Sequence, residues 1–233
     1  NGVVVEKVEE ALRDSSLGEF KSKKLATRDG ARFYGVYDFP GQQEEVAVGD
    51  IVSMRLTLNN SFDRSCGLSW SLGLLRKICS NGMVTMVNDS ITDSLNECMD
   101  KYRESVNVFK KMREFELSKE QGELILDNLV IKKVLSESLK DSIAPIWTNK
   151  SFRIESGHNN VAHDRNMYNL YNAVTQHLTH DVQEHRFELS TRSNRNVLSN
   201  LHKATREPLF FKKLTSKVPE KQKTATVVDL AAN

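Results

Sequence analysis

Cationic and amide side chains gather around one predicted β-hairpin in the first third of the chain. Alternating apolar residues predict one strand over residues 52 to 58 and another over residues 68 to 74. Guanidinium, ammonium and carboxamide groups are the side chains that contact phosphates and base edges in nucleic acids. The residues of this kind in and beside the hairpin are Arg55, Asn59, Asn60, Arg64, Arg76, Lys77 and Asn81. The alternative is structural: Asn60 and Asp63 hold the turn, and Arg64 pairs with Asp63.

Two tyrosines extend this candidate nucleic-acid site. Tyr34 and Tyr37 belong to a β-prone run from Arg32 to Phe39. Aromatic rings beside a cation are the groups on which unstacked bases lie, and this predicts a preference for single strands. The alternative is that both rings fill one face of a sheet.

The histidines suggest a metal site only weakly. Five of the six lie close together in sequence, at His158, His163, His177, His180 and His185. Their spacing matches neither HExxH nor a zinc finger, and Cys79 does not sit in a nucleophile elbow. The glycines form no phosphate-binding loop. We therefore predict a protein that is not an enzyme and takes no cofactor or metal, with a metal-dependent nuclease as the least favoured alternative.

The charge of the chain is asymmetric. The net charge is only +2, yet residues 182 to 233 hold ten lysines and arginines against five carboxylates. That segment carries +5 and the residues before it −3. A basic end on a slightly acidic body is expected of a protein with a polyanionic partner, although a solvated basic tail gives the same count.

Cysteine usage and hydropathy bear on the compartment. Three cysteines without CxxC spacing argue against a disulfide framework and favour a reducing cytosol. No apolar run approaches the roughly 20 residues of a membrane helix. We expect a cytoplasmic protein with no membrane role.

The order of the predicted elements indicates an α+β fold. The first third supplies four or five antiparallel strands, which long helices over residues 89 to 140 and 160 to 180 cover on one face. Pro40-Gly41 is expected to close the strand at 32 to 39, and a capping box at Ser118 to begin a helix that runs to Pro145. We predict one domain over residues 1 to 210 and a mobile basic tail over residues 211 to 233.

Three segments resemble a family of phage- and plasmid-encoded proteins catalogued as a domain of unknown function. They are Asn60-Ser61-Phe62-Asp63, Arg76-Lys77-Ile78-Cys79-Ser80-Asn81, and the run from Tyr168 to Thr175 followed by Leu178-Thr179-His180. The family commonly has histidine where this chain has Phe62 and glycine where it has Arg64, so a role that needs that histidine is not carried over. The resemblance implies a mobile-element origin and a cytosolic setting, without an activity.

These features together predict a non-catalytic nucleic-acid-binding protein of a phage or plasmid. We expect it to favour single-stranded DNA and to act in recombination or replication. A sheet with long helices across it is also the plan of phage single-strand annealing proteins, and by that analogy we expect a homo-oligomer. The alternative is a protein-interaction module that inhibits or redirects a host defence factor.

Overall fold

The computed structural model describes residues 2–27, 30–63, 67–76, 82–88, 98–149, 151–153, 160–162, 164–178 and 187–217. The chain divides into two compact units, Asn1–Lys110 and Lys111–Asn233. This division differs from the single domain predicted to residue 210. Its boundary falls inside helix α3 (Cys98–Glu114), whose buried stripe continues from Phe109 to Met112, so the sequence carries no linker signal there.

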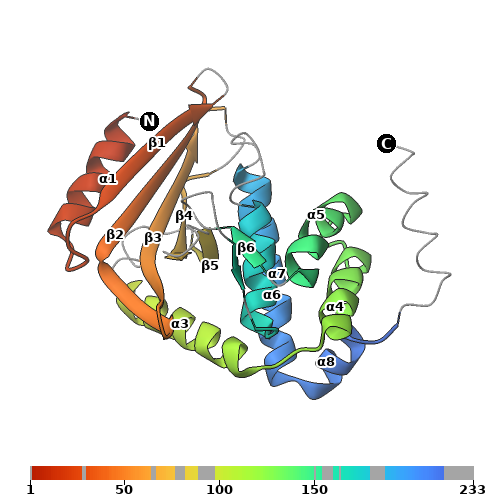
Figure 1. Ribbon diagram of the computed structural model, residues 1–233. Helices are drawn as coiled ribbons and strands as arrows, with labels where there is room; N and C mark the ends of the chain where they lie inside the picture. The colour runs from red at the N-terminus through yellow and green to blue at the C-terminus, as the bar shows by residue number, and fades with distance from the viewer. Residues whose placement is uncertain are drawn as a thin grey trace. The chain divides into compact units, whose positions relative to one another are not determined.

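The first unit contains a five-stranded antiparallel sheet, which confirms the predicted α+β class (Figure 1). The strands follow one another in space as they do in sequence, in the order β1-β2-β3-β4-β5. Their bounds are β1 Lys21–Thr27, β2 Arg32–Ala47, β3 Asp50–Ser61, β4 Ser69–Arg76 and β5 Gly82–Asn88. The two strands of the predicted hairpin are β3 and β4, paired from Val52↔Arg76 to Asn59↔Ser69.

Strand β2 is longer than predicted, because Pro40-Gly41 does not end it. The pairing with β3 shifts register between Phe39 and Gln43 and then continues to Ala47. An irregularity of this kind accommodates a proline, which has no N–H to offer the ladder. The hydroxyl of Tyr102 on α3 lies 3.3 Å from the carbonyl oxygen of Gln42 and 3.0 Å from that of Val52.

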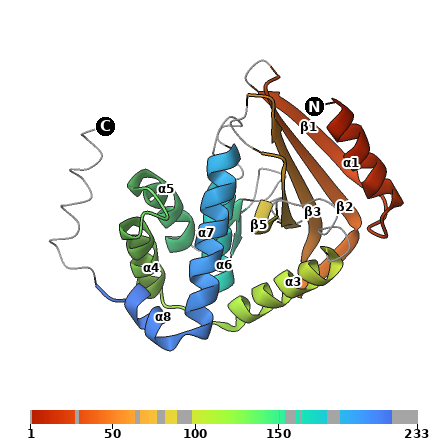
Figure 2. The ribbon, with the colours of Figure 1, turned by 180° about the vertical axis from the view of Figure 1, so that it is seen from behind.

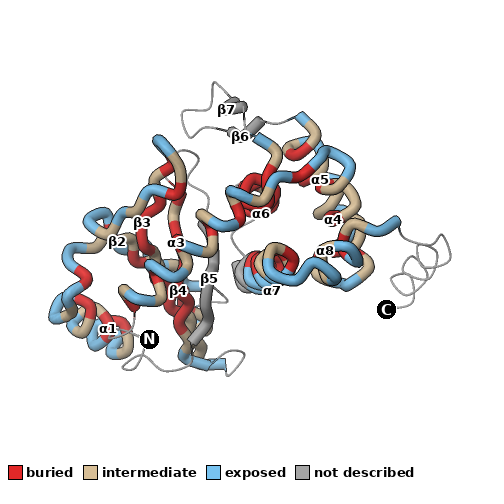
Figure 3. The backbone as a smooth tube through the Cα atoms, turned by 90° about the horizontal axis from the view of Figure 1, so that it is seen from below, coloured by how far each residue is buried: buried red, intermediate tan, exposed pale blue. Residues whose placement is uncertain are grey.

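Helices α1 (Gly2–Asp14) and α3 lie against one face of this sheet, the apolar face. Side chains directly opposite each other in paired strands point to the same side, so Tyr37, Leu56 and Leu72 share this face. The sulfur atoms of Cys98 on α3 and Met54 on β3 are 3.8 Å apart. At the β1 side, Glu9 of α1 forms an ion pair with Lys24 at 2.6 Å. The red tube segments in Figure 3 follow this buried layer.

The second unit is mainly helical and is built around α6 (Met167–Gln176). Every residue of α6 is buried, and the helix contacts α5, α7 and β6. Figure 2 shows α6 beside α7. The other elements are α4 Lys119–Ile131, α5 Glu137–Thr148, β6 Ser151–Arg153, β7 Asn160–Ala162, α7 Phe187–Arg206 and α8 Pro208–Leu214. The helices expected to cover the sheet beyond α3 therefore pack against one another in a unit of their own.

The helix predicted from Ser118 to Pro145 is two helices. Ser118 does form the predicted capping box with Gln121. The chain then turns at Lys133, whose φ is +56°, and Ser136 caps α5 by accepting a hydrogen bond from the amide of Leu139. Pro145 lies inside α5 and does not end it.

None of the described helices is both long enough and apolar enough to cross a membrane.

Candidate nucleic-acid interface

The residues of the predicted hairpin site divide between the two faces of the sheet. Tyr34 and Tyr37 lie three positions apart on one regular strand, so their side chains point to opposite sides. Arg55 and Asn59 share the face of Tyr34, which we call the polar face. Asn60 and Arg76 belong to the side of Tyr37, the apolar face. The described members of the predicted site therefore do not form a single cluster.

Both described arginines of the predicted site already hold carboxylates. Arg55 binds Asp38, its cross-strand neighbour on β2, through two hydrogen bonds of 2.5 and 2.8 Å. Arg76 binds Asp50 through two bonds of 2.7 Å, and both side chains are buried. In each pair the Nε and Nη2 edge of the guanidinium is engaged by one carboxylate, which offsets its charge and fixes its orientation within the sheet. These arginines act as structural ion pairs.

The two tyrosine rings are not available for stacking. Tyr37 has no exposed surface and Tyr34 keeps 6% of its own. Burial, with the charge of Glu9 as a smaller cause, raises the pKa of Tyr37 to about 12. Stacking on a base requires an accessible ring face, so the interpretation of these tyrosines as sheet-filling residues accounts for them.

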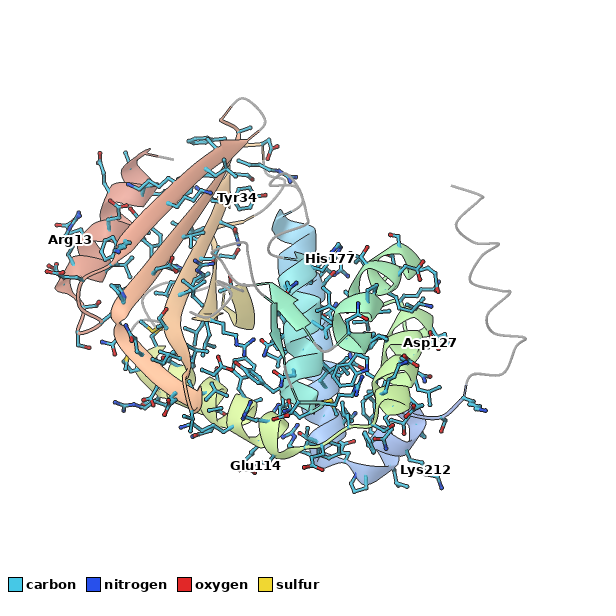
Figure 4. All side chains as sticks on the ribbon, in the orientation of Figure 1. Arg13, Tyr34, Glu114, Asp127, His177 and Lys212 are labelled. Atoms are coloured by element: carbon cyan, nitrogen blue, oxygen red, sulfur yellow. The ribbon has the colours of Figure 1, made fainter. Side chains whose placement is uncertain are left out.

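Other predicted site residues lie outside the described part of the chain. This holds for Arg64, Lys77 and Asn81, and for the histidines at 158, 163, 180 and 185. His177 is described and half-buried, just beyond α6 (Figure 4). Within the described ranges, no group of three His, Cys, Asp or Glu side chains is arranged to hold a metal ion.

The structure assembles a different basic group around α8, a helix that includes the first residues of the segment predicted to be a mobile tail. Pro208 occupies the first turn, where a missing N–H costs nothing, and Leu214 is fully buried. The side chain of Asn128 on α4 donates to the carbonyl oxygens of Leu214 at 3.0 Å and Ser216 at 3.1 Å. The rings of Phe115 and Phe211 meet edge to face at 5.0 Å. Helix α8 is thereby attached to α4 and to the end of α3.

The ring of Phe210 holds two cations of this basic group. The ammonium groups of Lys132 and Lys203 each lie 4.9 Å from the centroid of this ring. We define the α8 surface as the exposed cations of α8 and of the chain segments next to it at the ends of α4 and α7, which are Lys132, Lys133, Lys203, Arg206, Lys212, Lys213 and Lys217. All seven are exposed, and Lys212 is labelled in Figure 4.

The α8 surface has little negative charge to offset these cations. Glu207 is the one carboxylate between residues 203 and 217, and its side chain is half exposed at 3.7 Å from Lys203. The two ammonium groups on Phe210 are within about 10 Å of each other, close to the screening length of physiological salt, so they raise each other's affinity for an anion. The sequence signal that could have located this surface is the Phe-Phe-Lys-Lys run at 210 to 213 inside the basic C-terminal segment.

Comparison of the chain with family models, with curated proteins and with solved structures finds no match. The resemblance to the phage and plasmid family therefore stays a prediction.

Proposed function

We propose that this protein is a non-catalytic nucleic-acid-binding protein that holds its ligand at the α8 surface. The observation that carries the proposal is the pair of lysines over Phe210 within a group of seven exposed cations and one carboxylate. Dense positive charge of this kind binds a phosphate backbone by releasing its counterions. The resemblance in sequence supports a phage or plasmid setting and a role in recombination or replication.

The preference for single strands is the second part of the proposal. Phe210 is half-buried and Leu209 is 77% exposed on the same short helix, so apolar surface lies among the cations. The apolar faces of bases are accessible only when the bases are unstacked. Sites that bind single strands combine cations with side chains that contact these faces. A duplex would meet the same cations with its phosphates alone.

A titration against salt tests the proposal. Labelled single-stranded and duplex oligonucleotides of equal length are titrated with the protein at several salt concentrations. We expect tighter binding of the single strand and a steep fall of affinity with salt. In the triple variant Lys203→Gln, Lys212→Gln, Lys213→Gln, the logarithmic salt slope for single strands should fall by about two, since each neutralised phosphate contributes about 0.7.

A matched control separates a local site from total charge. The triple variant Lys7→Gln, Arg13→Gln, Arg103→Gln removes the same charge from exposed helical positions in the first unit. We expect it to bind as the parent does. Equal losses in the two triple variants, or no binding at low salt, would overturn the proposal and favour the protein-interaction alternative.

The same oligonucleotides test the non-catalytic part. We expect them to remain intact after long incubation with Mg²⁺ or Mn²⁺. Cleavage that disappears in a His163→Ala variant would instead support a metal-dependent nuclease.

A further inference from the structure

Helix α7 carries a row of cations along its outer side. Its buried residues, which include Val197, Leu201 and Ala204, lie on one side of the helix. The exposed residues on the opposite side recur every three or four positions, so they fall within about a quarter of the helix circumference. We call them the α7 stripe, and they are Arg192, Arg195, Ser199, Lys203 and Arg206.

The charge of the α7 stripe has one sign and a regular spacing. The sequence has no carboxylate between Glu188 and Glu207. The four cations form two pairs, one at 192 and 195 and one at 203 and 206. At about 1.5 Å of rise per residue, the pairs are separated by about 12 Å along the axis and the whole stripe spans about 21 Å. Cations in a line of this kind suit a polyanion that is itself a chain.

The α7 stripe leads into the α8 surface. Lys203 and Arg206 belong to both, and the ammonium group of Lys203 lies 4.9 Å from the centroid of the Phe210 ring. Helix α8 begins two residues after α7 ends and contacts it (Figure 2). A ligand held at Phe210 therefore meets further cations along α7, in the direction of Arg192.

We infer that the α7 stripe and the α8 surface form one track for a single strand. This inference rests on the proposed function and adds to it the length and the position of the bound strand. At the 3.4 Å per nucleotide of a stacked strand, the stripe corresponds to about six nucleotides, and the contacts at Phe210 add about two. A strand of about eight nucleotides fills the track, whereas one of about four is held at the α8 surface alone.

Oligonucleotides of different lengths test the inference on the full chain. Labelled oligothymidines of about four, eight and sixteen nucleotides are titrated with the parent and with the variant Arg192→Gln, Arg195→Gln at several salt concentrations. We expect the variant to bind the shortest strand as the parent does. For the two longer strands its logarithmic salt slope should be lower than that of the parent by about 1.4, because two phosphate contacts of about 0.7 each are lost.

Two matched variants separate the α7 stripe from total charge. Arg192→Lys, Arg195→Lys keeps the charge of the stripe and should keep the salt slope of the parent. Lys7→Gln, Arg13→Gln removes two charges from exposed positions of α1 in the first unit and should also keep that slope. Thermal unfolding compares the stability of all three double variants with that of the parent.

The results distinguish this inference from the proposed function. An unchanged salt slope of the Arg192→Gln, Arg195→Gln variant for the longer strands, or an equal loss for the shortest strand, would overturn the inference. The triple variant at Lys203, Lys212 and Lys213 would in that case still show its own loss if the proposed function holds. No binding of any strand by the parent at low salt would overturn both. The two longer strands decide alone where the shortest binds too weakly to measure.

Discussion

The indole ring of Trp147 on α5 occupies the space that a side chain at Gly122 on α4 would need. A Cβ atom built at Gly122 would lie 2.2 Å from Cε2 of Trp147. Trp147 is fully buried, and its Nε1 donates to the carbonyl oxygen of Lys119 at 3.1 Å. The contact between α4 and α5 thus depends on the absence of one methyl group.

Gly122→Ala should destabilise the second unit by about 1 to 3 kcal/mol, because the ring is fixed by its hydrogen bond and cannot move away without loss. Urea unfolding followed by the fluorescence of Trp147 measures the effect. Gly2→Ala is the matched control, since a Cβ there has nothing within 4 Å. Equal stability of the two variants would show that α4 and α5 separate at little cost.

The two ion pairs of the sheet should differ in their effect on stability. Arg76→Ala leaves the carboxylate of Asp50 buried without its partner and should cost about 3 to 5 kcal/mol. Arg55→Ala should cost about 1 kcal/mol, because both side chains of its pair are about a quarter exposed and water screens them. Trp70 is the one tryptophan of the first unit and Trp147 that of the second, so a Trp147→Phe background lets Trp70 alone report the unfolding. A larger loss from Arg55→Ala would contradict this ranking.

Alkaline pH should destabilise the first unit. Burial raises the pKa of the Cys98 thiol to about 11 from 9.0, with Lys101 opposing the shift, and burial raises the pKa of Tyr37 to about 12. Above pH 9 the unfolded chain therefore releases protons that the folded chain keeps, and the free energy of unfolding falls as pH rises. Between pH 9 and 11 Cys98 alone should account for about 2 kcal/mol. Urea midpoints across this range measure the slope, which should be shallower in Cys98→Ala.

Asn128 should control the order of α8. Its side-chain amide donates to the carbonyl oxygens of Leu214, the last residue of α8, and of Ser216, which follows the helix. It also donates to the carbonyl oxygen of Leu124. Asn128→Leu should speed hydrogen exchange in residues 208 to 216 and weaken oligonucleotide binding, while the exchange of α6 stays unchanged. Asn200→Leu, which removes a comparable amide bond to the carbonyl oxygen of Asn196 in α7, serves as the control. Unchanged exchange at α8 would show that Phe211 and Leu214 suffice to attach it.

The local patterns of the sequence predicted most of the elements. Alternation located β3 and β4, and helical spacing located α1, the described part of α3, and α6. The position of Tyr34 and Tyr37 on opposite faces could also have been predicted from the sequence. Residues an odd number of positions apart on a regular strand point to opposite faces of the sheet. The ion pair of Arg55 with Asp38 could not be predicted from the sequence, because it depends on the register between β2 and β3.

Helix α8 was missed for a related reason. Its composition is that of a tail, and what orders it lies far away in the sequence, in Phe115 and Asn128. A short helix has too few of its own hydrogen bonds to persist without such contacts. The prediction of a mobile segment is therefore wrong for residues 211 to 217, and the rest of that segment lies outside the described residues.

The division of α3 between the two units bears on how this protein can be inherited. The stripe of buried side chains on that helix runs through Tyr102 and Phe109 in the first unit to Met112 in the second. A recombination event that separates the halves at their boundary cuts α3 between Phe109 and Met112 and leaves each part of the helix without the turn that continues it. Exchange of one half between genes should therefore destabilise α3 at the point of exchange. We expect the two halves to be inherited together in one reading frame.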